Sequence, residues 1–267
     1  MAKVSKEYST VEIDGRLMIV TINRPEVYNA LHPMANKELG EVFDEFAANP
    51  DLWVAIITGA GDKAFSAGND LKYHAQLQAT TGKRPQLGPR GFGGLAARFD
   101  LDKPVIAAVN GVAMGGGFEI ALACDIIIAS DTATFALPEP KVGLTAGAGG
   151  MQRLSRQIPL KKAMGMMLTG RHVPAKEGHE LGFVTAVVPH AKLMDEAKRW
   201  ANDIIACSPL SVRTTKQVVM RALDVPSLEM AMRNQNYPAI VSIATSEDAV
   251  EGPKAFAEKR KPNWKGK

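Results

Sequence analysis

Short apolar runs and one longer amphipathic segment define the first part of the chain. The runs at residues 53–58, 105–109 and 125–130 are rich in β-branched side chains and bounded by turn residues, which is typical of buried strands. Residues 33–49 repeat apolar side chains at helical spacing, with a proline in the first turn. An Asp-Gly pair at Asp14 predicts a hairpin turn between residues 9 and 22. This succession of strands and helices predicts an α/β fold.

The pattern changes after a last strand predicted at residues 184–188. Every later apolar segment has helical spacing: residues 192–206, 212–222, 228–242 and 248–259. We therefore divide the chain into a core at residues 1–200 and a helical region at residues 201–267. That region has more apolar surface than short helices can cover on themselves, so association with another subunit is expected. The apolar side chains concerned are Met230, Met232, Tyr237, Ile240 and Ile243.

Two segments between these parts have a less regular pattern. Residues 80–94 are rich in Gly, Pro, Lys and Arg, which predicts a mobile surface loop. Residues 95–101 are predicted to form a short helix leading into the strand at 105–109. Three glycines at 115–117 then precede an apolar helical segment at 118–124.

Composition excludes several classes of protein. The 267 residues have an ordinary globular composition and a net charge of +4, and no basic and aromatic stripe suggests nucleic-acid binding. The N-terminus has no apolar signal segment, and the apolar region at 105–129 is interrupted by polar residues, so no membrane span is predicted. Two distant cysteines and five unpaired histidines form neither a disulfide framework nor a metal motif. A cytoplasmic enzyme without a metal is expected.

Glycines follow two of the predicted strands at points where helices begin. Gly68-Asn69 precedes a helix that starts near Asp70, and Gly115 to Gly117 precede the helix at 118–124. The first amides of a helix have no partner within it and lie at its positive end. Glycine turns after strands are also common structural features, and neither turn matches a phosphate-binding loop. If the two turns converge, one N–H from each can form an oxyanion hole.

Two carboxylates stand close to these turns in the sequence. Glu119 interrupts an apolar helix, and Glu139 lies between two prolines after a predicted strand at 134–137. Each has an ordinary explanation: Glu119 in a salt bridge or partly exposed, and Glu139 in a surface turn. Their shared position beside strand ends favours a joint role instead. Two carboxylates around one water can act as general acid and general base.

Three long segments carry a resemblance to a known family. They read FSAGNDLK, GVAMGGGFE and FALPEPKVGLTAGAGGMQRL. Together with Asn23-Arg24-Pro25 and Asn29-Ala30-Leu31, they resemble the signature segments of the enoyl-CoA hydratase (crotonase) family, and the similarity covers nearly the whole chain. Within that family, the closest resemblance is to the carnitinyl-CoA dehydratases.

The resemblance implies a fold, an assembly and catalytic roles. The fold is a crotonase-like spiral of repeated β-β-α turns with a helical C-terminal trimerisation region, in a homotrimer or a hexamer made of two trimers. The backbone N–H groups of Asn69 and Gly116 would form the oxyanion hole. Glu119 and Glu139 would be the catalytic carboxylates of a hydratase.

The resemblance also implies where coenzyme A binds. It places CoA along six residues of one subunit: Val27, Ala67, Asn69, Asp70, Leu71 and Lys72. Phe256 and Lys259 would contact the CoA held by the neighbouring subunit. CoA enters as part of the substrate, so no further cofactor is expected.

The expected activity is reversible syn addition of water across the 2,3 double bond of a 2-enoyl-CoA thioester. The acyl group stays open, because Asn69 and the loop at 144–148 depart from the carnitinyl-CoA dehydratase pattern. An enoyl-CoA isomerase or an acyl-CoA thioester hydrolase of the same family is the alternative. A non-enzymatic CoA-binding or RNA-binding protein is a third interpretation, which the two retained carboxylates disfavour.

Overall fold

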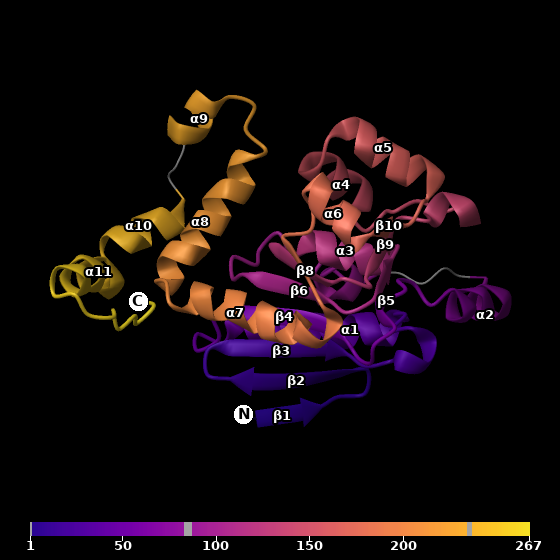
Figure 1. The fold of residues 1–267 in the computed structure, drawn as a ribbon, viewed down its shortest axis with the longest axis horizontal. Helices are drawn as coiled ribbons and strands as arrows, with labels where there is room; N and C mark the ends of the chain where they lie inside the picture. Colours follow the sequence, from indigo (N-terminus) through magenta and orange to yellow (C-terminus); the bar gives the residue numbers. More distant parts are fainter. Residues whose placement is uncertain (1, 83–86, 234–236) are drawn as a thin grey trace.

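The computed structural model describes residues 2–82, 87–233 and 237–267 and contains two β-sheets with helices packed around them (Figure 1). The larger sheet has the strand order β1-β2-β3-β4-β6-β8-β11. Its strands are β1 (Ala2–Ser5), β2 (Ser9–Asp14), β3 (Leu17–Ile22), β4 (Val54–Gly59), β6 (Val105–Val109), β8 (Ile126–Ser130) and β11 (Ala186–Val188). β1, β2 and β3 pair antiparallel, and every later pairing in this sheet is parallel.

The smaller sheet has the order β10-β9-β7-β5 and consists of very short strands. They are β5 (Ala64–Ser66), β7 (Val112–Met114), β9 (Thr134–Ala136) and β10 (Val173–Pro174). Each of β4, β6 and β8 in the larger sheet is followed along the chain by one of β5, β7 and β9, which pair in parallel. A helical segment comes next in each case, so the predicted β-β-α repeat and its spiral arrangement are confirmed.

Six α-helices lie in the described part of the chain between residues 33 and 181, and all but the helix at Leu71–Thr81 bury residues in the protein. They are α1 (Pro33–Ala48), α2 (Leu71–Thr81), α3 (Gly116–Ala123), α4 (Gly150–Gln157), α5 (Leu160–Thr169) and α6 (Ala175–Leu181). α3 is buried along nearly its whole length, and Phe118 on it lies 5.1–5.2 Å, ring centre to ring centre, from Phe135 and Phe183. This main core explains why the strands read as continuous apolar runs: both faces of β4 and β6 are buried.

The second face of the larger sheet is covered by α7 (Leu193–Ile205). Leu193, Ala197 and Ala201 pack there against isoleucines of the central strands, among them Ile56 and Ile106. The boundary predicted between residues 200 and 201 therefore falls inside a helix that belongs to the core. The division of the chain into two parts otherwise stays a prediction.

The remaining helices extend away from the sheets at one end of the molecule (Figure 1). They are α8 (Pro209–Ala222), α9 (Leu228–Arg233), α10 (Pro238–Ala244) and α11 (Glu247–Ala257). The helix predicted at 228–242 is thus described as two helices, and its residues 234–236 lie outside the described part of the chain. Met230 and Met232 are more than half exposed, so the expected uncovered apolar surface is present.

The helix predicted at residues 95–101 is wrong, because the chain forms successive turns there. A 3-10 turn at Phe92–Gly94 precedes them, and Phe92 is 1% exposed. The prediction of a surface loop at 80–94 is therefore also wrong for these three residues and for residues 80–81, which end α2, and residues 83–86 of that loop lie outside the described part. Arg98 explains the turns: its buried guanidinium bonds to Asp100 and Asp44, which fixes a compact conformation.

The first turn of α3 lies directly against β5. A Cβ atom built on Gly117 would lie 2.0 Å from the carbonyl oxygen of Ser66, a distance that real structures do not allow. The backbone of α3 reaches β5 only because position 117 has no side chain.

We expect Gly117→Ala to lower the free energy of unfolding by about 1–3 kcal/mol, because the new methyl group must push the two backbones apart. Gly165→Ala is the matched control, since a Cβ on this glycine of α5 meets no atom within 4 Å. The control gains helix propensity and should be neutral or slightly stabilising. Chemical denaturation of both variants measures the difference, and equal stabilities would contradict the close contact.

Candidate functional site

The two glycine turns meet at one edge of the smaller sheet. One turn follows β5 and the other follows β7, and these strands are parallel neighbours, so their carboxyl ends lie side by side. A Cβ atom on Gly68 would lie 2.8 Å from the backbone nitrogen of Gly116 and 2.6 Å from the oxygen of Met114. Gly68 also has φ +85°, a conformation that other residues rarely adopt. The predicted convergence of the turns is therefore present in the structure.

Both turns leave amides without a partner among the described residues. The N–H groups of Asn69 and Gly116 donate no hydrogen bond there, and neither does Gly117 N–H, whereas the amides on both sides of Asn69 and the amide before Gly116 are bonded. Gly115 N–H, for example, donates to Ala136 O at 2.9 Å. Gly116 is also the first residue of α3, where the helix end carries partial positive charge. Two free N–H donors on touching turns are suited to binding an oxygen that gains negative charge.

Glu119 lies on α3, one turn beyond these amides, and is 3% exposed. Its Oε1 accepts a hydrogen bond from Gly150 N–H at 2.8 Å. Burial, helped by the charge of Glu139 and opposed by the Gly150 hydrogen bond, raises the pKa of Glu119 to about 7. The carboxyl group can therefore gain or lose a proton near neutral pH.

Glu139 is half-buried and opens a 3-10 turn (Glu139–Val142) just after β9. Its Oε2 is buried and has no hydrogen-bond partner among the described residues. Its Oε1 faces the glycine turn, because a Cβ on Gly115 would lie 2.9 Å from it. Burial raises the pKa of Glu139 as well. A buried carboxyl oxygen without a partner is costly, which indicates a place for a water or a ligand atom.

The two carboxyl groups belong to one site. They reach it from different elements, α3 and the turn after β9, and Gly115 lies beside both the first turn of α3 and Glu139. Because each raised pKa favours the neutral form, the pair is suited to holding one proton between two groups. One carboxyl group can then accept a proton while the other donates one.

Residues predicted to bind CoA fall into two groups. Six lie on the turn after β5, at the start of α2 and on the neighbouring 3-10 turn (Pro25–Val27): Val27, Ala67, Asn69, Asp70, Leu71 and Lys72. Leu71 and Lys72 are exposed, and Ala67 N–H donates to Tyr28 O at 2.9 Å, which ties the two segments together.

Phe256 and Lys259 lie far from that group in the same chain. Phe256 is 88% exposed on α11, and Lys259 is exposed just beyond it. Figure 1 shows α11 and α2 on opposite sides of the molecule. One chain does not bring these residues to its own glycine turns, so their predicted contact needs a second subunit.

The sequence pattern did not indicate a functional role for two residues that lie beside Glu119. Gly150 supplies the amide that binds Glu119, and Arg153 in the next turn of α4 donates from Nη2 to Ala96 O at 2.9 Å. The half-buried guanidinium of Arg153 lowers the pKa of Glu119, against the effect of burial. The sequence does contain a signal for Gly150, since Gly149-Gly150 begins a third helix after a glycine-rich turn. Only the packing of α4 against α3 shows that the Gly150 amide binds Glu119.

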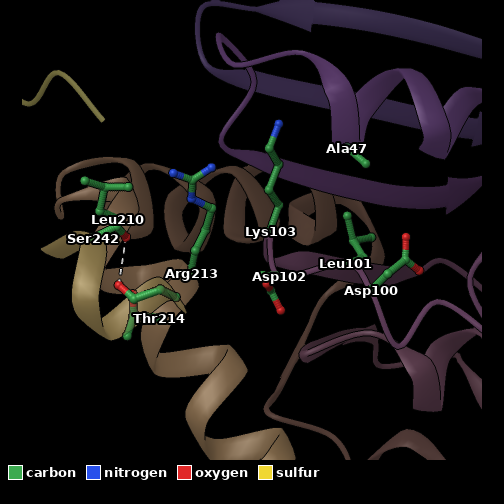
Figure 2. Close-up of a pocket in the computed structure, with 10 residues that line it drawn as sticks. Ala47, Asp100, Leu101, Asp102, Lys103, Leu210, Arg213, Thr214 and Ser242 are labelled. Carbon is green, nitrogen blue, oxygen red and sulfur yellow. Dashed lines mark hydrogen bonds between the residues drawn. The ribbon is translucent and has the colours of Figure 1, made fainter. Parts of the chain in front are cut away.

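A cavity of about 220 Å³ lies apart from these residues, between α8, α10 and the segment 100–103 (Figure 2). Arg213 and Lys103 extend into this region from facing elements. Lys103 Nζ donates to the carbonyl oxygens of Phe46 and Asn49, which end α1, and burial lowers its pKa to about 8. The cavity contains neither of the paired carboxylates, so we assign it no part in the chemistry above.

Other chemical groups were searched for over residues 2–82, 87–233 and 237–267. Within these ranges, no three His, Cys, Asp or Glu side chains cluster as metal ligands would. No helix in the same ranges has the length and hydropathy of a membrane span. Cys124 is buried, Cys207 is exposed, and both are free thiols.

Comparison with known proteins gives one consistent match. The family model described as Enoyl-CoA hydratase/isomerase matches residues 12–267. The carnitinyl-CoA dehydratase of Escherichia coli strain K12 is 45% identical over 260 residues, which cover 95% of this chain and 97% of that protein. The crystal structure of an enoyl-CoA hydratase from Mycobacterium tuberculosis H37Rv superposes with a TM-score of 0.90 at 38% identity, covering 98% of this chain and 100% of that one. An enoyl-CoA hydratase from Bacillus anthracis gives 0.88 at 33% identity, with the same coverage.

The raised pKa of Glu119 predicts a stability effect with a definite sign. Between the ordinary value of 4.5 and about 7, the unfolded chain releases a proton that the folded protein keeps, so stability falls as pH rises through this window. Glu119→Gln retains an acceptor for Gly150 N–H without the charge. We expect this variant to exceed the wild type in unfolding free energy by about 1–3 kcal/mol at pH 8, with the difference vanishing towards pH 4.

Thermal or chemical unfolding across this pH range measures the difference. Glu180→Gln is the control, because Glu180 is exposed on α6 and should show no such dependence. A Glu119→Gln variant less stable than the wild type at pH 8 would contradict the burial argument.

Proposed function

Because the chain belongs to the enoyl-CoA hydratase/isomerase family, we propose that it reversibly adds water across the 2,3 double bond of a 2-enoyl-CoA thioester, with syn geometry. The observation that carries this proposal is the site itself: free amides on two touching turns stand beside two carboxyl groups with raised pKa values. A thioester and one water need these groups and no others.

In the proposed reaction, the N–H groups of Asn69 and Gly116 bind the thioester carbonyl oxygen. They draw electron density from the double bond and stabilise the negative charge that reaches this oxygen as water adds. Glu119, as the carboxylate, takes a proton from the water that attacks Cβ. Glu139, as the neutral acid, delivers a proton to Cα. Dehydration uses the same groups in reverse, so the pair starts each direction with its single proton on the opposite carboxyl group.

The CoA portion is proposed to lie along the segment from Ala67 to Lys72 and beside Val27, as the sequence predicts. CoA is part of the substrate, and the proposed chemistry uses no added cofactor. The exposed apolar side chains of α9 and α10 support association into a homotrimer or a hexamer. In that assembly, Phe256 and Lys259 would reach the CoA bound to the neighbouring subunit.

The acyl group is proposed only by class. The relatives carry two names, carnitinyl-CoA dehydratase and enoyl-CoA hydratase, so a carnitinyl group is one candidate among 2-enoyl and 3-hydroxyacyl thioesters. The loop at 144–148 and the position of Asn69 would shape the acyl pocket. A panel of thioesters varied in length, branching and charge would identify the preferred group.

We expect Glu119→Gln and Glu139→Gln each to lower kcat for crotonyl-CoA hydration by about 10²–10⁴, because each removes one proton-transfer group. Loss of ultraviolet absorbance of the conjugated thioester follows the reaction. Glu180→Gln serves again as the surface control and should keep the wild-type rate. Unchanged turnover in either active-site variant would remove that residue from the mechanism.

Product analysis separates the other candidate functions. Hydration raises the product mass by one water, isomerisation leaves it unchanged, and thioester hydrolysis releases a free thiol. Absence of conversion for the whole panel, together with RNA binding that weakens steeply with salt, would favour a binding protein instead.

The intersubunit contact predicts a change in binding with little change in chemistry. We expect Lys259→Gln to raise KM for the CoA thioester about three- to tenfold, because one charge near the CoA phosphates is lost, while kcat changes less than twofold. Lys254→Gln is the matched control, because Lys254 is also exposed and lies on α11, just before Lys259 in the chain. Equal KM values for the two variants would contradict a role for Lys259 in the neighbouring site.

A further inference from the structure

The turn that carries the Asn69 amide is built onto residues 28–31. Hydrogen bonds between the two segments form a short parallel bridge. They run from Ala67 N–H to Tyr28 O at 2.9 Å, from Leu31 N–H to Gly68 O at 2.8 Å, and from Asp70 N–H to Leu31 O at 3.1 Å. The position of the free amide is therefore set by segment 28–31 more than by β5 itself.

Ser66 connects both segments through one hydroxyl group. The side chain is fully buried. Its Oγ donates to Asn29 O at 2.8 Å and accepts from Gly68 N–H at 3.1 Å. Across residues 67–70, the amides of 67, 68 and 70 are thus all bonded, and the Asn69 N–H alone is free within the described part of the chain.

Asn29 in turn holds segment 28–31 in an unusual shape. Its Nδ2 donates to Ala60 O at 3.0 Å and to Ala64 O at 2.7 Å, and its Oδ1 accepts from Arg24 N–H at 2.9 Å. Tyr28 and Asn29 have φ values of 54° and 55°, two consecutive residues in the left-handed region. Such backbone costs free energy and persists only where surrounding bonds enforce it.

We propose that Ser66 and Asn29 are positioning residues for catalysis: they fix the turn so that, of the amides of residues 67–70, only the Asn69 N–H faces the thioester oxygen, which the Gly116 N–H binds from the other turn. Neither side chain touches the substrate in this arrangement. The inference rests on the proposed oxyanion role of Asn69. It adds that the hydroxyl group of Ser66 and the side-chain amide of Asn29 determine the orientation of the Asn69 N–H.

Ser66→Ala tests the proposal with little loss of volume. It removes the bond to Asn29 O and frees Gly68 N–H, so the turn can shift and a second amide can compete for the oxygen. Misplacement of a catalytic donor by a fraction of an ångström lowers the rate without preventing binding. We expect kcat for crotonyl-CoA to fall at least about tenfold, with KM changed less than about threefold.

A spectroscopic measurement distinguishes a change in the orientation of the Asn69 N–H from a general loss of stability. The double variant Glu119→Gln, Glu139→Gln is expected not to convert crotonyl-CoA. Crotonyl-CoA labelled with ¹³C at the thioester carbonyl is bound to this double variant, and its infrared C=O band is recorded. Hydrogen bonds from the oxyanion amides shift this band to lower frequency. We expect Ser66→Ala to reduce the shift by at least about half.

Ser130→Ala is the matched control. Ser130 is also fully buried and is the last residue of its strand, β8, as Ser66 is of β5. Its Oγ accepts a hydrogen bond from the amide two residues further on, Thr132 N–H, at 3.2 Å. A merely structural effect would appear in both variants as a lower Tm, whereas only Ser66→Ala should change kcat and the carbonyl band. If Ser66→Ala fails to fold, Ser66→Cys fills the same space with a weaker hydrogen-bonding group and is measured in its place.

The outcomes are distinguishable. A wild-type band shift that survives in full in the Ser66 variant, with unchanged kcat, overturns the positioning role and leaves the proposed function intact. If crotonyl-CoA, or the thioester that the panel identifies as preferred, binds to the Glu119→Gln, Glu139→Gln protein without any shift of its carbonyl band, the oxyanion assignment is overturned and the positioning role with it. A reduced shift and a lower kcat, found for Ser66 and not for Ser130, support both.

Discussion

Direct contact between two stretches of bare backbone is the constraint on which the site depends. Gly68 lies against the amide of Gly116, and Gly117 lies against the carbonyl of Ser66, at distances where no side chain fits. Parallel pairing of β5 with β7 brings these turns to the same edge. The contact has two effects: it joins two repeats of the spiral, and it leaves unpaired N–H groups on both turns within the described part of the chain. Stability and the candidate chemistry therefore draw on the same geometry.

The carboxyl groups show the opposite relation between stability and function. Glu119 is buried beside apolar side chains, and Glu139 has a buried oxygen without a partner among the described residues. Both arrangements disfavour the charged form and cost folding free energy above neutral pH. The hydrogen bond from Gly150 and the charge of Arg153 limit this cost for Glu119. A site that must exchange protons near pH 7 requires such a balance, because an exposed glutamate would stay ionised.

Much of the fold could be read from the sequence, for physical reasons that particular elements make clear. β6 and β8 were predicted within one residue because both faces of the sheet are buried, which gives an uninterrupted apolar run. The three-residue strands β5 and β7 were not predicted, because each is too short for a periodic pattern and ends in a glycine turn, whereas the equally short β9 lies within a strand predicted at 134–137. The turns at 95–101 were mistaken for a helix, because the ion pair between Arg98 and Asp44, which helps to fix them, joins residues distant in sequence.

By itself, the sequence determined which groups are available: glycine turns at two helix starts, and carboxylates at Glu119 and Glu139. These are local features, because glycine acts through its own backbone and a charge in an apolar segment is visible in the segment. Only the tertiary structure decided which amides stay free. That outcome depends on partners from other elements, such as segment 28–31 for the turn at 67–70 and α4 for Glu119. Hydrogen-bond satisfaction is a property of the folded whole, so the pattern of residues could name the donors but not show which of them the fold leaves unpaired.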